Sequence, residues 1–347
     1  MRPQIRQPRI AKRTLTSSHQ NFTDPWAFRD AIQSAQVEVL LTRRGEFRAE
    51  LTRVDLHKLS LQSGRETLPR VGRGAIGARR TAIYFLQGRS QAGGVHSGVD
   101  FFPGEIVVNP AGSTYHHMTS AESHWADVSL SLTDLAAALD SLAGRQLGQG
   151  GLPQILRPQP GPMSRLAKLH RAATTLAGTT PDFLARPEVA RSVEQGLIHA
   201  MVLCFIEPET DRGSPINSRH RTLLSRFEDL LAERRNEPLH LPEICAAIGV
   251  RERTLRAYCQ QHLGMGPIRF LWLRRMHLAR QALMRADPTS VTVTSVATAQ
   301  GFFELGKFSV ACRSLFGEPP SATLRLRERD KASPTISPFA APSAVLA

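Results

Sequence analysis

Hydrophobic residues in the first part of the chain come in short runs separated by glycine and proline. Such runs, bounded by turn residues, are typical of β-strands. We therefore expect a small β-barrel or sandwich over residues 21–145. The runs that we expect to form its strands are 37–41, 47–56, 81–86, 105–109, 113–118 and 125–132.

The spacing becomes helical from residue 132, and two amphipathic helices are expected within 146–206 after a glycine- and proline-rich connection. Their apolar stripes are Met163, Leu166, Leu169, Ala173 and Leu176, and Val189, Val193, Leu197, Met201 and Cys204. Each stripe must be buried, either against the strands or in a dimer interface, and the pattern leaves both open. A linker is expected over 207–216.

The last third of the chain contains the same pattern twice, offset by 52 or 53 residues. Each copy has a short helix with small residues, a glycine at the turn and a second helix of about three turns, which is the helix-turn-helix pattern. We expect these units at 242–263 and 293–316, joined by a basic helix near 267–285. The matched positions are Ile244, Gly249, Leu255, Cys259, Gly264 and Pro267 with Val296, Gly301, Phe308, Cys312, Gly317 and Pro320.

Charge strengthens the nucleic-acid interpretation. The formal net charge is +14, and residues 244–286 hold eight arginines against one acidic residue, whereas 287–330 are neutral. A basic excess predicts attraction to a polyanion, so the first unit and the joining helix are expected to supply most of the salt-dependent affinity for DNA. The four cysteines are widely spaced, which predicts neither a disulfide framework nor a thiolate zinc site.

The second copy resembles the DNA-binding domain of the AraC/XylS family of bacterial transcription regulators. The resemblance runs from Phe227 to Glu328, within an expected DNA-binding domain at 217–328. It implies two helix-turn-helix units bridged by a long helix, and a cytoplasmic activator. Cys259 and Cys312 depart from the aromatic residue usual near the end of each recognition helix, and we expect them to be small core residues. The residues that fill the family's skeleton are Ala297, Gly301, Phe302, Phe308, Phe316, Gly317, Pro320 and Arg325.

By analogy with that family, the exposed sides of the two second helices are expected to contact the DNA major groove. Arginine suits this role because its planar fork can pair with guanine or clamp a phosphate. In the first unit the expected DNA-binding residues are Arg251, Arg253, Thr254, Arg256 and Gln260. In the second they are Glu304, Leu305, Gly306, Lys307, Ser309 and Arg313, a weakly charged set suited to contact by shape or methyl groups, or to contact with RNA polymerase.

The N-terminal half resembles cupins only locally, in the Gly104, Pro110 and Gly112 spacing of a strand and turn. A catalytic metal cupin needs ligands from two motifs, and Tyr115 stands where its histidine is usual, with His116 and His117 following and His96 alone. We expect no metal, cofactor or catalysis, and a small-molecule effector site instead. Six aromatic residues are candidates to line it or to fill the core: Trp26, Phe28, Tyr84, Phe101, Phe102 and Trp125.

The fold class that follows is α+β and multidomain: a cupin-like N-terminal β-barrel with a helical dimerisation segment, then an all-α domain. The ends, 1–20 and 329–347, are expected to be flexible and disordered, and no stretch is expected to cross a membrane. The leading function is a sequence-specific transcription regulator that binds double-stranded DNA, a small-molecule effector and RNA polymerase as a homodimer. Alternatives are a repressor, an architectural DNA-binding protein, and a cupin metal enzyme fused to a DNA-binding domain.

Overall fold

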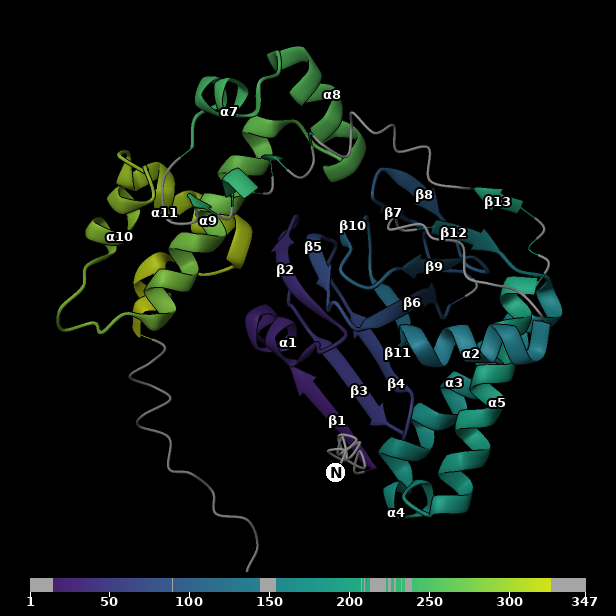
Figure 1. The fold of residues 1–347 in the computed structure, drawn as a ribbon. Helices are drawn as coiled ribbons and strands as arrows, with labels where there is room; N and C mark the ends of the chain where they lie inside the picture. The colour runs from purple at the N-terminus through teal and green to yellow at the C-terminus, as the bar shows by residue number, and fades with distance from the viewer. Residues whose placement is uncertain are drawn as a thin grey trace, which may run out of the picture. The chain divides into compact units, whose positions relative to one another are not determined.

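The computed structural model describes residues 15–88, 90–143, 154–206 and 239–325, together with the positions 208, 210–212, 223, 226, 227, 229–231, 233 and 234. The chain divides into two compact units. One contains residues 1–233 and 240–270, and the other 234–239 and 271–347, so the division falls within one long helix. Each unit is described by itself below (Figure 1).

The N-terminal region is built from two sheets whose neighbouring strands pair antiparallel. The larger sheet has the order β1-β3-β4-β11-β6-β9-β12-β13 and the smaller β2-β5-β10-β7-β8. The larger sheet comprises β1 (Thr16–Phe22), β3 (Ala49–Asp55), β4 (Ser60–Glu66), β6 (Arg80–Leu86), β9 (Ile106–Asn109), β11 (Ser123–Ser131), β12 (Gln154–Arg157) and β13 (Thr210–Arg212). The smaller comprises β2 (Ala35–Leu41), β5 (Arg70–Ile76), β7 (Gly94–His96), β8 (Val99–Phe101) and β10 (Thr114–Thr119).

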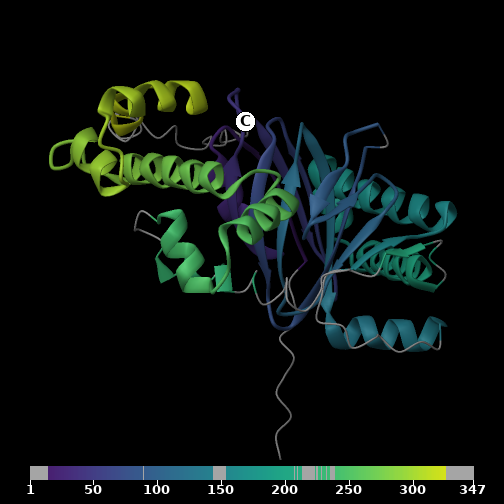
Figure 2. The same ribbon diagram turned by 90° about the horizontal axis from the view of Figure 1, so that it is seen from above.

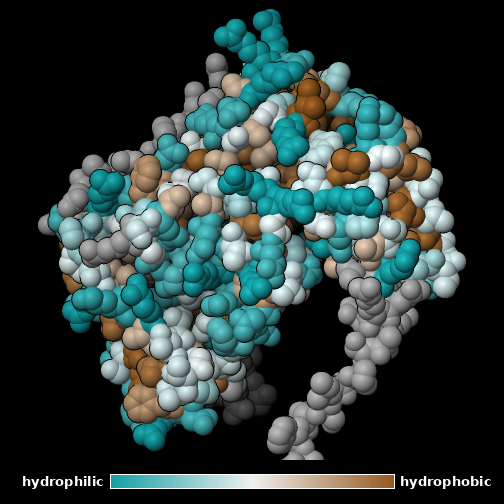
Figure 3. All heavy atoms as spheres, turned by 180° about the vertical axis from the view of Figure 1, so that it is seen from behind, coloured by the Kyte–Doolittle hydropathy of each residue, from teal (hydrophilic) through white to brown (hydrophobic). Residues whose placement is uncertain are grey.

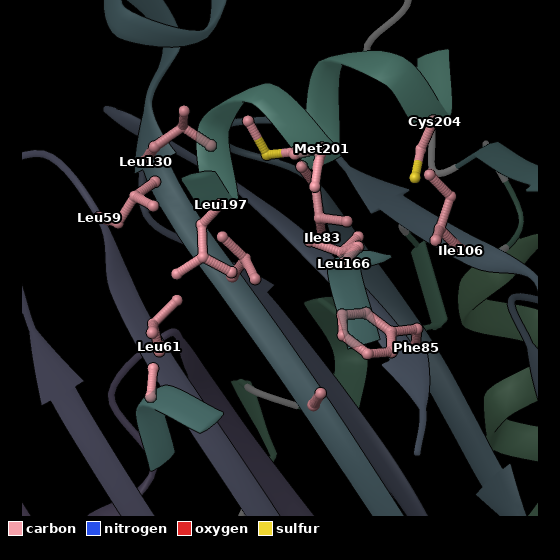
Figure 4. Close-up of a cluster of buried hydrophobic side chains, with 14 of the residues drawn as sticks. Leu59, Leu61, Ile83, Phe85, Ile106, Leu130, Leu166, Leu197, Met201 and Cys204 are labelled. Carbon is pink, nitrogen blue, oxygen red and sulfur yellow. The ribbon is translucent and has the colours of Figure 1, made fainter. Parts of the chain in front are cut away.

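Helices cover one face of the larger sheet, as Figure 2 shows for the teal segments beside the strands. They are α2 (Leu132–Ala143), α3 (Pro160–Thr179), α4 (Pro181–Leu184) and α5 (Pro187–Ile206). Figure 4 shows Leu197 and Met201 of α5 beside Ile83 of β6 in the core between these layers. Both predicted apolar stripes contribute to this core, with Leu166 and Leu197 completely buried. Packing against the strands accounts for the buried members of both stripes, while Leu169, Val189 and Val193 are half-buried, so a dimer interface on these helices stays a prediction.

The opposite face of the larger sheet packs on the smaller one. Phe101 of β8 and Trp125 of β11 are both buried in this second core, together with Phe28 from α1 (Pro25–Ala31). Because side chains alternate along a strand, β11 sends Trp125 and Asp127 toward the smaller sheet and Val128 toward the helices. The central strands of the larger sheet are thus buried on both faces.

Helix α5 alone among the described helices is long and apolar enough to cross a membrane, with a mean hydropathy of 1.3 over its most apolar window. This corrects the expectation that no stretch would qualify. Its residues Leu197, Met201 and Cys204 are nevertheless completely buried against the sheet. That packing is typical of a core helix, which passes the same test.

The C-terminal region is helical, as expected. Glycines in the left-handed conformation end three helices: Gly249 (φ 71°), Gly264 (φ 66°) and Gly317 (φ 82°). This conformation favours a residue without Cβ. The helices are α7 (Leu241–Ile248), α8 (Glu252–Leu263), α9 (Pro267–Arg285), α10 (Val293–Ala299) and α11 (Leu305–Phe316), and residues 320–325 are helical as well.

The structure corrects the sequence predictions in three places. The expected barrel is not closed, because the strands form two separate sheets, each of which has two edge strands. Residues 16–20, expected to be flexible, begin strand β1, which pairs with β3 through Thr16 and Asp55. The expected linker contains β13, which pairs with β12. Residues 1–14 and the expected tail lie outside the described residues, and the predicted domain boundaries remain predictions.

Candidate nucleic-acid interface and effector cavity

Helix α8 places the predicted arginines of the first unit on its surface. Its inner side is held by Leu255 and Cys259, both completely buried. Phe227 adds to this core, with its ring centroid 6.2 Å from that of Tyr258. The five predicted DNA-binding residues on or before this helix are all exposed: Arg251, Arg253, Thr254, Arg256 and Gln260.

The exposed arginines of the first unit differ in how available their charge is. The Arg256 Nε donates to a Glu252 carboxylate oxygen at 2.7 Å, one turn earlier on the same helix. Within the part of the chain that the structure describes, neither Arg251 nor Arg253 forms an ion pair. A pair at the surface contributes little stability but offsets charge, so Arg253 presents more positive potential than Arg256.

Helix α11 has the same architecture with a different surface. Phe308 and Cys312 are buried, with only 2% and 3% of their surface exposed. The predicted residues Glu304, Leu305, Gly306, Lys307 and Arg313 are exposed and Ser309 is half-buried. The Lys307 Nζ lies 2.6 Å from a Glu304 carboxylate oxygen.

Two further exposed apolar residues lie near this surface and were not among the predicted DNA-binding residues. Phe303, in the turn before α11, is 79% exposed, and Val310 on the helix is 67% exposed. Aliphatic side chains at such positions can contact the methyl group of thymine. The available signal for Val310 was its position three residues after Lys307, on the same side of the helix.

The arginines of helix α9 differ in exposure: Arg269 and Arg285 are exposed, whereas the three between them are buried or half-buried. That this helix supplies salt-dependent affinity stays a prediction. Arg274 is only 8% exposed. The Arg275 guanidinium lies 5.1 Å from the centroid of the Phe302 ring, and burial lowers the pKa of Arg275. The Arg280 guanidinium lies 3.1 Å from a Glu318 carboxylate oxygen. Arg274, Arg275 and Arg280 therefore pack against neighbouring side chains. The net charge of residues 244–286 is larger than the charge that is exposed on their surface.

Cys259 and Cys312 are the small core residues that the sequence predicted. Both thiols are buried, and burial raises the pKa of each to about 12. A thiol with such a pKa remains protonated at neutral pH and is a poor nucleophile. Their role is packing.

A second site lies in the N-terminal region, where a cavity of about 30 Å³ opens between the two sheets. Its walls come from both sheets: Tyr84 pairs with Asp127 across β6 and β11, and His96 pairs with His117 across β7 and β10. The lining residues are Ile32, Ser34, Val37, Arg70, Ala82, Tyr84, His96, Asn109, Tyr115, His117, Trp125 and Asp127. Of the six predicted aromatic candidates, Tyr84 and Trp125 line it.

The polar groups of this cavity are unusually deep. Asp127 and His96 are 4% and 2% exposed. Burial raises the pKa of Asp127 to about 7, against the opposing effects of a hydrogen bond with Ser34 and the charge of Arg80. Burial also lowers the pKa of His96 to about 4, with a hydrogen bond to Asn109 acting in the opposite direction. Ionisable groups displaced in this way often mark functional sites.

Sequence reasoning missed Asp127 as a site residue. The available signal was an acidic side chain inside the strand run 125–132, next to hydrophobic residues that the structure buries on both faces. His96 had been noted only for its isolation, because its strand partner His117 is 21 positions away in the sequence.

A larger hollow of about 620 Å³ lies on the helical side of the N-terminal region. Its lining includes Arg157, Lys168 and Arg171, of which Arg157 is ion-paired to Glu105 at 2.9 Å. This hollow is therefore basic, unlike the inner cavity. Among the described residues, no three histidine, cysteine or acidic side chains lie close enough together to share a metal ion.

The molecular surface mixes hydrophilic and hydrophobic residues, as Figure 3 shows for one face. Hydropathy on that face therefore does not single out a site, and the exposed arginines of α8 and the inner cavity remain the candidates. Both rest on specific side chains rather than on a broad patch.

Comparison with known proteins supports the first candidate. Residues 244–326 match a family model described as a helix-turn-helix domain. The chain is 38% identical over 97 residues to the probable thc operon regulatory protein of Rhodococcus erythropolis, covering 28% of this chain and 29% of that protein. It is 28% identical over 103 residues to the XylDLEGF operon transcriptional activator 2 of Pseudomonas putida, covering 30% and 66%.

Among solved structures, the fatty-acid-bound ToxT of Vibrio cholerae strain SCE256 is similar over 85% of this chain and 96% of that one, at 13% identity and a TM-score of 0.27. The matches in sequence span less than two thirds of the length of either regulator above. The family model covers residues 244–326, so these residues form a helix-turn-helix domain.

Proposed function

We propose that this protein is a sequence-specific DNA-binding transcription regulator that activates transcription in response to a small molecule. The observation that carries the proposal is the pair of helix-turn-helix units, of which the first exposes Arg251, Arg253 and Arg256 on its second helix. Second helices of such units enter the major groove, where arginine reads guanine. Activation, rather than repression, follows the printed name of the Pseudomonas putida relative.

The two units are assigned different roles in this proposal. On α8, Arg251, Arg253, Thr254, Arg256 and Gln260 contact base edges and phosphates. On α11, Glu304, Leu305, Gly306, Lys307, Ser309 and Arg313 form a second contact surface with few available charges. Such a surface suits thymine methyl groups and the shape of the groove, and one part of it suits contact with RNA polymerase.

The inner cavity of the N-terminal region is the proposed effector site. Effector pockets are concave, mostly apolar and lined by a few convergent polar groups, and this cavity combines aromatic walls with Asp127 and His96. We propose no catalytic activity for it. A cytoplasmic location follows from a role on bacterial DNA.

Homodimerisation is proposed through the outward side of the helices that cover the larger sheet. Candidates are the exposed side chains Leu132 and Leu142 of α2, which are 50% and 47% exposed. Two copies would engage two half-sites and raise affinity through effective concentration. Sedimentation that shows only monomer at micromolar concentration would refute this part.

The DNA-binding proposal is tested by selection. Purified full-length protein is incubated with fragmented DNA from its source genome, and bound fragments are sequenced and footprinted. We expect a small set of promoter fragments that share a motif, bound at least about 1,000-fold more tightly than random DNA. Equal affinity for random and selected fragments would instead make the protein an architectural DNA binder. Linking the selected promoter to a reporter then separates activation from repression.

A further inference from the structure

The inner cavity presents two hydrogen-bond acceptors that lack partners. The Oδ2 of Asp127 is buried without a hydrogen bond among the described residues. The Nε2 of His96 lies 2.8 Å from the Oδ1 of Asn109. Because that amide oxygen can only accept, Nε2 carries the proton and Nδ1 keeps its lone pair. This Nδ1 is likewise buried without a partner in the described part of the chain. A ligand with N–H or O–H groups could therefore donate hydrogen bonds to both atoms.

The cationic groups around the cavity are already neutral or engaged. Arg70 is ion-paired to Glu66, with the Arg70 Nε 2.8 Å from a carboxylate oxygen and both side chains buried. That carboxylate also accepts from the Trp125 Nε1 at 2.9 Å. Burial lowers the pKa of His96 to about 4 and the pKa of His117 well below its usual value, so both rings are uncharged at neutral pH.

The remaining groups that face Asp127 leave it as the unbalanced charge. Arg80 acts on Asp127 from β6, but Arg80 is not among the residues that line the cavity, and its Nε donates to the Ser129 hydroxyl at 2.8 Å. Tyr84 and Tyr115 stay protonated, because burial raises the pKa of both phenols. An anionic ligand would therefore meet a carboxylate and no available cation.

The walls are also suited to a cation. The rings of Tyr84 and Trp125 are stacked with centroids 6.1 Å apart, and those of His96 and Tyr115 with centroids 4.7 Å apart. The faces and hydroxyls of such rings attract an ammonium group, most strongly where water is excluded. With one water needing about 10–15 Å³, a cavity of about 30 Å³ admits only two or three non-hydrogen atoms.

We propose that this cavity binds a compact primary ammonium ion, whose N–H groups donate to the Asp127 carboxylate and to the Nδ1 of His96. This inference rests on the proposed function in one respect: the ammonium ion is taken to be the effector because the inner cavity is the proposed effector site. The binding itself requires no DNA. A quaternary ammonium ion fits less well, since it has no N–H group for the two acceptors.

The proposal fixes a pH dependence. Below pH 7 the folded protein holds a proton on Asp127, which the bound ammonium ion must displace. The affinity for the ammonium ion is therefore expected to rise between pH 6 and pH 8 and to level off above pH 8. Because one proton is displaced, the affinity can change at most tenfold per pH unit below the pKa of Asp127. The neighbouring histidines do not reverse this trend, because their depressed pKa values keep them neutral over the whole interval.

The test uses the full-length protein and three probes of three non-hydrogen atoms each: ethylammonium, ethanol and formate. Calorimetric titration and thermal unfolding are measured at constant ionic strength. Ethylammonium is expected to bind with a Kd on the order of millimolar, as its few atoms permit, and to raise the Tm. Ethanol and formate are expected to do neither, and the bulkier tert-butylammonium ion is expected not to bind.

Asp127→Asn removes the charge at nearly constant shape. Because burial disfavours the charged carboxylate, this variant is expected to fold with a Tm no lower than that of the wild type at pH 7.5. Its affinity for ethylammonium is expected to fall at least tenfold and to lose its pH dependence. The matched control is Asp100→Asn, an exposed acid on β8 outside the cavity lining, which should retain both. Should Asp127→Asn fail to fold, His96→Phe keeps an aromatic ring and is expected to weaken binding several-fold.

Several outcomes overturn the inference: formate or ethanol binding as well as ethylammonium, unchanged ethylammonium affinity in Asp127→Asn, or no binding of any probe because the cavity holds only water. None of these affects selection of promoter fragments by the same protein. Conversely, ethylammonium binding without any preferred DNA sequence would sustain the inference and refute the proposed function.

Discussion

The two recognition helices, α8 and α11, share a scaffold and differ in surface chemistry. Each has 12 residues, ends at a left-handed glycine and buries a cysteine on its inner side. The outer side of α8 begins with Arg251 and Arg253, whereas that of α11 carries Leu305 and Val310. The spacing of buried residues therefore fixes the helix pair, while the exposed positions are free to specify what it contacts.

This difference implies that the two units contribute to DNA binding in different ways. Phosphate neutralisation by arginine releases counterions and makes affinity depend on salt. Methyl contacts by aliphatic side chains discriminate bases with little salt dependence. We therefore expect the first unit to dominate the salt-dependent part of affinity and the second to dominate a salt-independent part.

The shared scaffold predicts equal sensitivity to core truncation. Leu255→Ala and Phe308→Ala each remove a buried side chain, and each is expected to cost about 2–5 kcal/mol of unfolding free energy in its own unit. Amide hydrogen exchange, followed separately in α8 and α11, measures this locally. Ser314→Ala, at an exposed position of α11, is the control and should change little. Unchanged exchange in either core variant would show that its helix is not held as described.

The charge difference predicts unequal losses of DNA affinity. Arg253→Ala is expected to lose about 1–3 kcal/mol of binding free energy on a selected promoter fragment and to reduce the slope of log K against log salt by about 0.9. Arg256→Ala should lose less, since Glu252 already pairs with it. Lys307→Ala, paired with Glu304, should lose least. Titrations at four salt concentrations give both quantities, and a larger loss for Lys307→Ala would invert the comparison.

The internal arginines of α9 predict a loss of stability without a loss of salt dependence. Arg280→Ala removes a half-buried pair with Glu318 and a cation–π contact 4.9 Å from the Phe316 ring centroid. The expected cost is about 1–2 kcal/mol in the second unit, measured by hydrogen exchange in α11. Arg253→Ala is the reciprocal control, with DNA affinity reduced and exchange unchanged. If Arg280→Ala reduced the slope of log K against log salt, Arg280 would contact a DNA phosphate and this assignment would be wrong.

The apolar surface of α11 predicts the smallest effect. Val310→Ser is expected to weaken binding about two- to fivefold at unchanged salt slope, through loss of a thymine methyl contact. Replacing each thymine of the selected site by deoxyuridine, one at a time, removes the methyl from the DNA instead. At one position the wild type should lose affinity while Val310→Ser does not. Additive losses at every position would exclude the contact.

Some helices and strands could be predicted from the sequence and others could not. The spacing of Leu255 and Cys259 placed α8 correctly, and the predicted stripe from Val189 to Cys204 lies within α5. Strands with glycine, such as β5 (Arg70–Ile76), were missed, because glycine inside a strand reads as a turn. Helix α1 was missed because it has only seven residues and begins with a proline directly after Asp24, a pair that also occurs in loops.

Contacts between distant residues account for what the sequence could not supply. His96 and His117 meet only because β7 pairs with β10, and Asp127 joins them from the other sheet. No local pattern encodes such pairings, and the same holds for Arg275 over Phe302. Counting arginines therefore overestimated the surface charge of 244–286.

The sequence by itself determined the helix-turn-helix units, because their signals are local: periodic apolar residues, small residues at the close approach and glycines with left-handed backbone. It also determined which side chains α8 and α11 direct outward. Only the tertiary structure decided which arginines remain exposed and which acceptors lie buried without partners. Burial and pairing depend on which segments the fold brings together, and it is burial that displaces the pKa of Asp127 and withdraws Arg274 from the surface.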